Sequence, residues 1–350
     1  MPEMAIHVGA NDNPGMTCRS GPPLRAQDRP ELQFFLIILW HVNCAHVNNL
    51  SIHAYIVQPA SNGRRLMYAI IDKQVIAPTI TRFEIKAPFI ARKRKAGNFV
   101  MVRVEEGGER IPLTIADGNA AEGTITLIVQ AIGGTTKLLS SKNAGDMLLD
   151  VVGPLGNPTP IATNGVVACV GGGVGTAELY PIAKALGEAG NSVITVIGAR
   201  SKDLVILERE MAACSDETFV TTDDGSYARK GFVTDQLKDI LDSGRGVRAV
   251  YAIGPLPMMK AVSNLTRSYG VETLVSLNTI MVDGTGMCGG CRVTVSGQMK
   301  FACVDGPEFD GHAVDFDELM MRNRTYADME KISDQKHVCR LTGATRGVAS

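Results

Sequence analysis

An aspartate and three cysteines near the C-terminal end of the chain have a spacing that suits a metal centre. They follow the pattern Asp283-x4-Cys288-x2-Cys291-x11-Cys303. Plant-type [2Fe–2S] sites use Cys-x4-Cys-x2-Cys followed by a distant fourth cysteine, and Asp283 stands where the first cysteine is expected. The glycine-rich loop between these residues suits a chain that wraps closely around sulfides and directs amides at them. The spacing therefore predicts a [2Fe–2S] cluster held by these four residues.

Two other interpretations of this segment remain open. Zinc is often bound by Cys-x2-Cys with two further ligands, and His312 and Cys339 are further candidate donors, although both lie outside the compact loop. Alternatively, Asp283 is a bystander and another residue completes the cluster. A carboxylate oxygen is a harder donor than a thiolate, so ligation by Asp283 would change the reduction potential.

A second motif, Gly171-Gly-Gly-Val-Gly175, lies between a run that predicts a buried strand (166–170) and one that predicts a helix (176–188). Glycines in that position let the backbone approach a dinucleotide pyrophosphate, and the helix dipole favours its charge. Two later strand ends, at Asp223 and at Gly254, should meet the same crevice, because ligands of open α/β sheets bind at the carboxyl ends of strands. The predicted nucleotide-binding residues are Gly171, Gly172, Gly173, Gly175, Thr176, Arg200, Asp223, Asp224, Gly254 and Pro255.

The residues at the end of the second predicted strand do not decide between NAD(H) and NADP(H). This strand end has no acidic residue for a ribose hydroxyl and instead continues as Gly198-Ala-Arg200-Ser-Lys202. Arg200 and Lys202 suit a 2′-phosphate, but they also suit a solvated loop. Both NAD(H) and NADP(H) therefore remain open.

Three motifs nearer the N-terminus exceed what a plain β domain needs. Arg110-Ile-Pro-Leu-Thr114 places an arginine, a rigid turn and a hydroxyl on one strand, where they can meet a diphosphate and a flat heterocycle. Gly133-Gly-Thr-Thr136 opens a helical stretch whose amides and hydroxyls suit a pyrophosphate, and Gly153-Pro-Leu-Gly156 ends the domain with a stiff turn. The predicted cofactor-binding residues here are Arg110, Pro112, Leu113, Thr114, Gly133, Gly134, Thr135, Thr136, Gly153 and Gly156.

The patterning between these motifs predicts a multidomain chain. Residues 67–160 contain short β runs (68–76, 79–86, 98–104, 110–115, 124–131 and 147–152) at the spacing of a small antiparallel barrel. Residues 161–275 alternate strands with helices, including one near 204–213, which is typical of a doubly wound α/β parallel sheet. Residues 276–350 form a small iron–sulfur segment.

Residues 1–66 differ in character from the rest. They hold the only tryptophan and show no sustained helix or strand period, whereas a regular β pattern begins at Met67. We expect a disordered extension or a mis-assigned start. The short apolar run 34–40 follows several arginines, but no convincing cleavage site follows it, so it makes a weak secretory signal.

Composition excludes several classes of function. A formal charge of −1, from 35 basic and 36 acidic residues, gives no large field to attract nucleic acid or an anionic membrane. No run reaches the roughly 18 to 20 apolar residues of a membrane span. Eight cysteines in 350 residues do not suggest a disulfide scaffold, and a reducing cytoplasm fits their grouping better.

With these motifs in order, the chain from Met67 onward resembles the ferredoxin reductase-like electron-transfer subunits that accompany dihydroorotate dehydrogenase and sulfide dehydrogenase. That resemblance implies FAD in the first domain, NAD(P)H in the second and the [2Fe–2S] cluster in the third. Electrons would pass between these groups and a partner. The cofactors carry the chemistry, so no catalytic side chain is expected and none is needed as a general base.

Asp283 also points to one branch of this family. Aspartate with three cysteines, and the tail from Phe301 to His312, resemble the small subunit of the electron-bifurcating NADH-dependent reduced ferredoxin:NADP oxidoreductase. The resemblance implies a larger partner subunit with another FAD and [4Fe–4S] clusters, and ferredoxin as a further partner. The alternatives are an electron-transfer subunit of dihydroorotate dehydrogenase in pyrimidine biosynthesis and a stand-alone flavin reductase.

Overall fold

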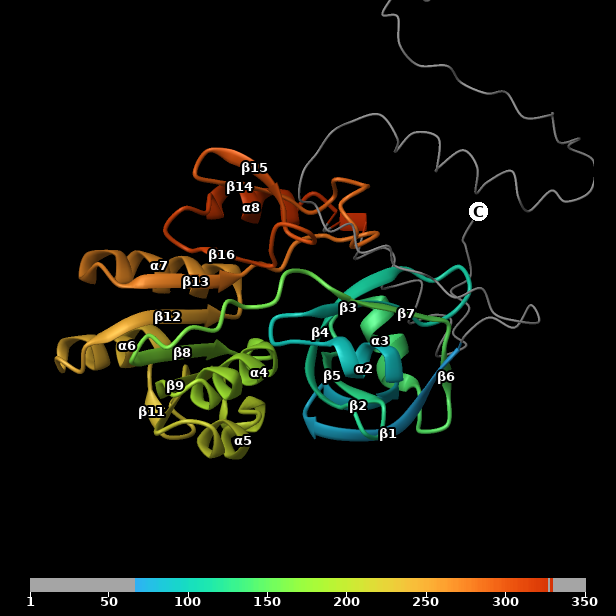
Figure 1. Ribbon diagram of the computed structural model, residues 1–350, viewed down its shortest axis with the longest axis horizontal. Helices are drawn as coiled ribbons and strands as arrows, with labels where there is room; N and C mark the ends of the chain where they lie inside the picture. The colour runs from blue at the N-terminus through green and yellow to red at the C-terminus, as the bar shows by residue number, and fades with distance from the viewer. Residues whose placement is uncertain (1–66, 327, 330–350) are drawn as a thin grey trace, which may run out of the picture. The chain divides into compact units, whose positions relative to one another are not determined.

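The computed structural model describes residues 67–326, 328 and 329 (Figure 1). The expectations for residues 1–66 and for Cys339 fall outside these residues. None of the helices in the described part is long and apolar enough to cross a membrane.

The first sheet is antiparallel throughout and has the strand order β6-β1-β2-β5-β4-β3-β7. Its edge strands, β6 and β7, are consecutive in the chain and are separated by Leu149 alone, so the sheet curls into a nearly closed barrel. Alternate side chains, such as Phe83 and Leu127, fill its interior and are fully buried. The strands are β1 (Tyr68–Ala77), β2 (Ile80–Lys86), β3 (Phe99–Arg103), β4 (Arg110–Asn119), β5 (Thr124–Gln130), β6 (Met147–Leu148) and β7 (Asp150–Leu155).

Two short helices accompany the barrel. Helix α2 (Pro88–Lys93) begins with a proline at its first position, where the missing N–H costs no hydrogen bond. The next residue, Arg94, forms an ion pair of 2.8 Å with Asp117 of β4 and so ties the end of α2 to the barrel. Helix α3 (Gly134–Ser141) covers the barrel through Leu139, which is fully buried.

The second sheet has the order β11-β10-β9-β8-β12-β13-β16 and is parallel except for its edge strand β16. The chain reverses direction across the sheet beside β8, which creates the crevice where ligands of such sheets bind. The elements are β8 (Val166–Gly172), α4 (Gly175–Glu188), β9 (Ser192–Ala199), a 3-10 turn η2 (Lys202–Leu204), α5 (Glu208–Ala213), β10 (Glu217–Thr222), β11 (Arg229–Lys230), α6 (Val233–Asp242), β12 (Val247–Ile253), α7 (Leu256–Tyr269) and β13 (Glu272–Ser276).

Helices cover both faces of this sheet because successive side chains of each central strand point in opposite directions. Ala168 and Val170 of β8 pack in the cluster formed with α6 and α7. Val167 and Cys169 pack on the other face with α4 and α5. Strands buried on both faces are uniformly apolar, and this explains why these strands could be predicted from the sequence.

The third segment is joined to the second sheet. Its strands β14 (Arg292–Val295) and β15 (Gln298–Phe301) form a hairpin whose turn residues, Ser296 and Gly297, both have positive φ, as a type I′ turn requires. Strand β16 (Glu308–Asp310) pairs antiparallel with β13. Helix α8 (Phe316–Asn323) is capped at its N-terminus by Asp315, whose carboxylate accepts the Glu318 N–H. In Figure 1 this segment lies beyond the β13 edge of the sheet.

The predicted fold class is confirmed, but two of the predicted elements are wrong in detail. The run 147–152 forms two strands, because the Leu149 N–H bonds to the carbonyls of Arg103 and Val104 and interrupts the first ladder. The run 204–213 is not one helix, because Leu207 has a left-handed φ of 56° and divides the 3-10 turn η2 from α5. Strands β13 to β16 and helix α8 were not predicted.

Candidate functional site

A crevice of about 750 Å³ opens at the carboxyl ends of the parallel strands. Seven of the ten predicted nucleotide-binding residues line it, and the other three, Gly171, Thr176 and Asp224, do not. Residues of β2 and β5 line it too, so the crevice lies between the barrel and the second sheet. The predicted residues in its lining are Gly172, Gly173, Gly175, Arg200, Asp223, Gly254 and Pro255.

The glycine turn between β8 and α4 has the close packing that its sequence predicts. A side chain at Gly175 would place its Cβ 2.5 Å from the carbonyl oxygen of Ile253, so only glycine lets α4 approach the end of β12. Gly173 has a φ of +56° and open space beside it. No side chain caps the N-terminus of α4. Its first turn therefore presents amides and a positive dipole end to the crevice.

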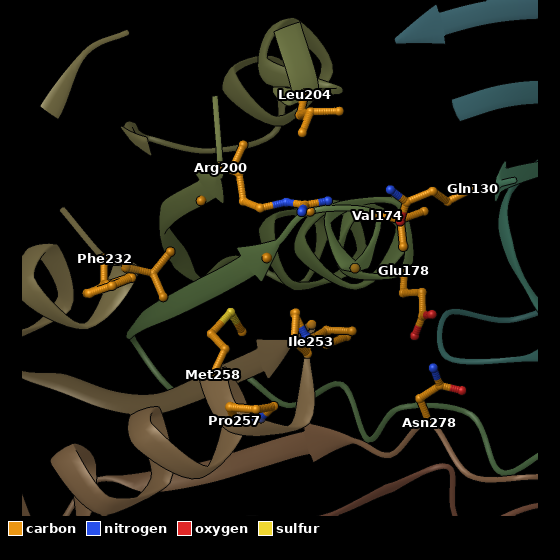
Figure 2. A pocket seen from close by; sticks show the side chains of 18 of the residues that line it. Gln130, Val174, Glu178, Arg200, Leu204, Phe232, Ile253, Pro257, Met258 and Asn278 are labelled. Atoms are coloured by element: carbon orange, nitrogen blue, oxygen red, sulfur yellow. The ribbon is translucent and has the colours of Figure 1, made fainter. Parts of the chain in front are cut away.

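Side chains from the following strand ends complete the crevice. Arg200 follows β9, and Figure 2 shows its side chain reaching toward Val174 at the start of α4. Asp223 follows β10 and lines the same space. Asp224 instead accepts the Ser226 N–H at 2.9 Å. The hydroxyl of Ser226, and then this backbone bond, lower the pKa of the Asp224 carboxyl.

The barrel motif Arg110-Ile-Pro-Leu-Thr114 is divided between two places. Pro112, Leu113 and Thr114 line a small cavity of about 40 Å³ next to the crevice. Arg110 lies at the start of β4, half-exposed, with its guanidinium 3.9 Å from the Asp150 carboxylate. The small cavity has room for about one water molecule.

The other two barrel motifs lie outside both cavities. Thr136 Oγ1 accepts the Gly133 N–H at 3.0 Å, and the Thr135 hydroxyl donates to Glu109 at 3.0 Å, so both threonines hold the start of α3. Gly134 is the first residue of α3. Gly153 lies against β3, and Gly156 has a φ of +75° and packs on the Phe99 ring.

Glu178, in the first turn of α4, was not predicted as a functional residue, although it lines both cavities. The Thr114 hydroxyl of β4 donates a hydrogen bond to its carboxyl. Burial is the main reason that the pKa of Glu178 rises to about 7, and the charge of Glu308 raises it further, whereas the Thr114 bond lowers it. Figure 2 shows the Glu178 and Asn278 side chains pointing toward one another.

Two of the three predicted cluster cysteines lie together in the third segment. Cys291 Sγ and Cys303 Sγ are 3.2 Å apart, and both residues are buried against Phe99 and Met101 of the barrel. Burial, and then the Cys291 thiol, raises the pKa of the Cys303 thiol to about 12. Two buried thiols this close can both ionise only beside a cation, and thiolates are the ligands that iron–sulfur clusters use.

Asp283 lies beside the remaining cysteine. Its Oδ2 accepts the Cys288 N–H at 2.7 Å and its Oδ1 accepts the Thr285 N–H at 2.6 Å. The bond from the Thr285 N–H, and to a smaller extent the one from the Cys288 N–H, lower the pKa of the Asp283 carboxyl and so favour its ionised form. The Gly290 N–H donates to Cys288 Sγ at 3.4 Å, as an amide directed at a cluster ligand would.

The four predicted ligands thus form two pairs, Asp283 with Cys288 and Cys291 with Cys303. In the part of the chain that the structure describes, no three His, Cys, Asp or Glu side chains converge on one point, as a single zinc ion would require. A cluster with two irons needs two ligands on each iron. The arrangement in pairs fits that requirement.

Ser276 and Asn278 were also missed from the sequence, and both line the two cavities together with Glu178. Ser276 ends the unpredicted strand β13, and Asn278 follows it. The sequence signal that could have revealed this part of the site is Glu178 itself. It is an acidic residue one turn after the glycine loop, in a helix face that is otherwise buried.

Comparisons with known proteins agree with this arrangement. Residues 278–315 match the model of the iron–sulfur cluster binding domain of dihydroorotate dehydrogenase B. The Thermotoga maritima protein named dihydroorotate dehydrogenase B (NAD(+)), electron transfer subunit homolog, is 52% identical over 274 residues, which are 78% of this chain and 96% of that protein.

Two solved structures agree as well. The structure of an NADH-dependent reduced ferredoxin-NADP oxidoreductase contains a chain that is 50% identical, with a TM-score of 0.75, and the match covers 79% of this chain and 99% of that one. Phthalate dioxygenase reductase, at 18% identity and a TM-score of 0.50 over 66% of this chain and 86% of its own, shows the ferredoxin reductase-like fold. The chain therefore belongs to the family of the dihydroorotate dehydrogenase B electron-transfer subunits, which are oxidoreductase subunits.

Proposed function

We propose that this chain carries electrons between a nicotinamide dinucleotide, FAD and a [2Fe–2S] cluster, and passes them on to a larger partner subunit. The observation that carries the proposal is the shared boundary of the two cavities. Glu178, Ser276 and Asn278 line both the crevice at the glycine turn and the small cavity beside β4. The small cavity also reaches Met281 and Pro307, on either side of the cluster loop.

In this proposal the crevice binds NAD(H) or NADP(H). The pyrophosphate lies at the uncapped start of α4, where Gly173 and Gly175 leave the amides accessible. Arg200 supplies positive charge at the end of β9, and Asp223 at the end of β10 is positioned to accept hydrogen bonds from a ribose. These residues bind and orient the nucleotide, and none of them takes part in bond breaking.

FAD lies along the barrel side of the same space. Pro112, Leu113 and Thr114 offer a flat apolar edge with one hydroxyl. Outside that cavity, the first turn of α3 from Gly134 onward offers amides for the diphosphate. Bound there, FAD would exchange two electrons with the nicotinamide and one at a time with a cluster. The barrel residues orient the flavin and keep water from its face.

The cluster is held by the pairs Asp283 with Cys288 and Cys291 with Cys303. The contacts of the second pair with Phe99 and Met101 place it against β3, the neighbour of the flavin strand β4. Direct packing of the cluster loop on the barrel keeps the path between the flavin and the cluster short, as electron transfer between them requires. Exposed Met287 and Val282 in the loop offer the partner an apolar surface.

For the partner, we favour the larger subunit of an NADH-dependent reduced ferredoxin:NADP oxidoreductase, with ferredoxin as a further partner. The solved structure of that enzyme contains a chain 50% identical to this one, and the aspartate in the cluster loop favours the same branch. A dihydroorotate dehydrogenase is the second candidate, because the Thermotoga relative carries that name. A cytoplasmic location fits the thiols, since Cys291 and Cys303 are close but not bonded.

The test is purification of the tagged chain from its native cells. We expect visible absorption from flavin and iron, and a larger flavin- and iron–sulfur-containing subunit in the complex. A dihydroorotate dehydrogenase in its place would overturn the preferred branch. A colourless chain that contains zinc would overturn the electron-transfer function, and full turnover by the chain alone would make it a stand-alone flavin reductase.

A further inference from the structure

A second half-buried glutamate, on a different segment of the chain, acts on Glu178 through its charge. Glu308 is on β16, directly across the ladder from Ser276 of β13. Its Oε1 accepts a hydrogen bond of 2.6 Å from the hydroxyl of Thr159, in the connection between the barrel and the second sheet. Its Oε2 is buried and has no hydrogen-bond partner among the residues that the structure describes. An unpaired carboxylate oxygen in that position is costly, so it calls for an explanation beyond packing.

Glu308 acts on Glu178 through its charge. The charge of Glu308 is among the causes that raise the pKa of Glu178, and burial raises the pKa of each group to about 7. The charge of Glu308 also acts on Tyr251 of β12. Burial, followed by the charges of Cys169 and Glu308, raises the pKa of Tyr251 to about 12. Among the described residues, the only hydrogen bonds that favour the charged carboxylates come from two neutral hydroxyls, those of Thr114 and Thr159.

The position of the pair matters as much as its chemistry. Thr114 connects Glu178 to the barrel strand. Ser276, the ladder partner of Glu308, lines both cavities, and β16 is part of the cluster segment. The pair therefore lies where all three parts of the chain meet. The accessible surface of Glu178 faces the cavities, which gives a proton a path from the crevice.

We propose that Glu178 and Glu308 form a proton-holding pair, which takes up one proton from the crevice when an electron reaches this junction and releases it when the electron leaves. This inference rests on the electron-transfer function proposed above. It differs from the expectation that no side chain needs to handle a proton.

The charges balance in this scheme. One carboxylate oxygen forms an O–H bond with a proton delivered by water in the crevice, and that O–H bond breaks again when the electron leaves. No electron passes through either glutamate, and when the electron resides on the cluster no other bond to hydrogen forms or breaks. An added electron and an added proton leave the net charge of the buried junction unchanged, which matters because unbalanced charge is expensive in a low-dielectric interior.

The test is a redox titration of the complex with its cofactors bound, between pH 6 and pH 9. Visible absorption follows the flavin and EPR follows the cluster. A one-electron couple that binds one proton changes by about 59 mV for each tenfold change in proton activity. Because a flavin takes up protons of its own on reduction, the cluster potential is the decisive one. We expect it to depend clearly on pH in the native protein and with less than half of that slope in the double variant Glu178→Gln/Glu308→Gln.

Glu272→Gln is the matched control, because Glu272 is an exposed glutamate on β13, the strand that pairs with β16. It should keep the native slope. An unchanged slope in the double variant would overturn the proposal. Infrared difference spectra of the native protein provide a second measurement that needs no variant: reduction should produce a protonated-carboxyl band that shifts in D2O, and its absence would also overturn the proposal.

The two hypotheses fail in different ways. A purified complex in which this chain binds neither flavin nor iron would refute the electron-transfer function, and the proton-holding pair with it. A chain that binds both, and whose potentials change with pH equally in the native protein and in the double variant, would refute the pair alone.

Discussion

The cluster loop and the nucleotide crevice were both predicted from the sequence, but they differ in how the chain builds them. The four predicted cluster ligands lie between residues 283 and 303, three on one loop and Cys303 just after the hairpin that follows it. The crevice is lined by residues from Ile80 to Asn278, which come from the barrel, the parallel sheet and the connection after β13. A site built from one short segment can be read from spacing alone, whereas a site assembled from distant segments cannot.

The two regions should also respond differently to substitution. In the proposed function the loop depends on a few ligands, so the loss of one should abolish the site. In the same proposal the crevice binds the nucleotide mainly through backbone amides at its rim, so single side chains should matter less than the fit of the backbone. The predictions below test this contrast, from the largest expected effect to the smallest.

Cys291→Ala should eliminate the cluster. Cys291 is buried and lies 3.2 Å from the Cys303 sulfur, and alanine leaves one pair without a thiolate. Iron analysis and the visible spectrum should show loss of almost all the iron, while the flavin remains. Cys214→Ala is the control, since Cys214 is a half-buried thiol of the second domain, and it should keep the full iron content. Retention of the cluster by Cys291→Ala would contradict the assigned ligands.

Gly175→Ala should weaken the crevice through the backbone. The added Cβ would lie 2.5 Å from the Ile253 carbonyl oxygen and would push α4 away from β12. Overpacking of this kind costs about 1–3 kcal/mol, so we expect a lower melting temperature and an affinity for NAD(P)H reduced about tenfold. Gly187→Ala is the control, because Gly187 lies near the other end of the same helix, does not line the crevice, and would place its Cβ 3.2 Å from the nearest carbonyl oxygen. Equal melting temperatures and nucleotide affinities in the two variants would show that the close approach at Gly175 is unimportant.

The same contrast explains what could be predicted from the sequence. Strands buried on both faces, such as β8 and β12, were found because their apolar runs and flanking glycines are local signals. The barrel was found from the spacing of its short strands. Glu178 looked like an ordinary acidic residue at a helix start, which usually means only a favourable interaction with the helix dipole. Its importance depends on Thr114 and Glu308, which are far from it in the sequence.

Strand β16 shows the limit most clearly. Its three residues, Glu308 to Asp310, have no periodicity that would reveal a strand, and the strand exists because β13 offers an open edge. Sequence patterns report local preference, whereas an edge pairing is decided by tertiary contacts. The position of Glu308 next to Ser276 could therefore not be foreseen.

Asp283→Cys should keep the cluster and change its potential. A thiolate donates more electron density to iron than a carboxylate does, so the variant should have a lower potential, by an amount on the order of 50–100 mV. EPR and a redox titration provide the measurement. Asp305→Asn is the control, because it removes a carboxylate of the same segment that accepts the Phe301 N–H at 2.6 Å and is not one of the assigned ligands. A potential equal to that of the native protein would mean that Asp283 is not a ligand.

Glu308→Gln should change the pH dependence of stability, which is the smallest of these effects. Below about pH 4.5 the carboxyl is protonated in both the folded and the unfolded chain, and it affects neither. Between pH 4.5 and about 7 the unfolded chain loses this proton while the folded chain keeps it, so the native protein loses stability as the pH rises. Above pH 7 the full penalty, on the order of 3 kcal/mol, is present.

Glutamine carries no such penalty, so the variant should gain free energy of unfolding relative to the native protein between pH 5 and pH 8. Comparing the two pH values cancels any constant cost of the amide at the buried Oε2 position. Denaturant titrations at each pH give the difference, and Glu272→Gln, at an exposed position on the neighbouring strand, should show none. A difference that stays constant with pH would mean that Glu308 is ionised in the folded protein at pH 5, so the junction would be a fixed charge unable to exchange a proton.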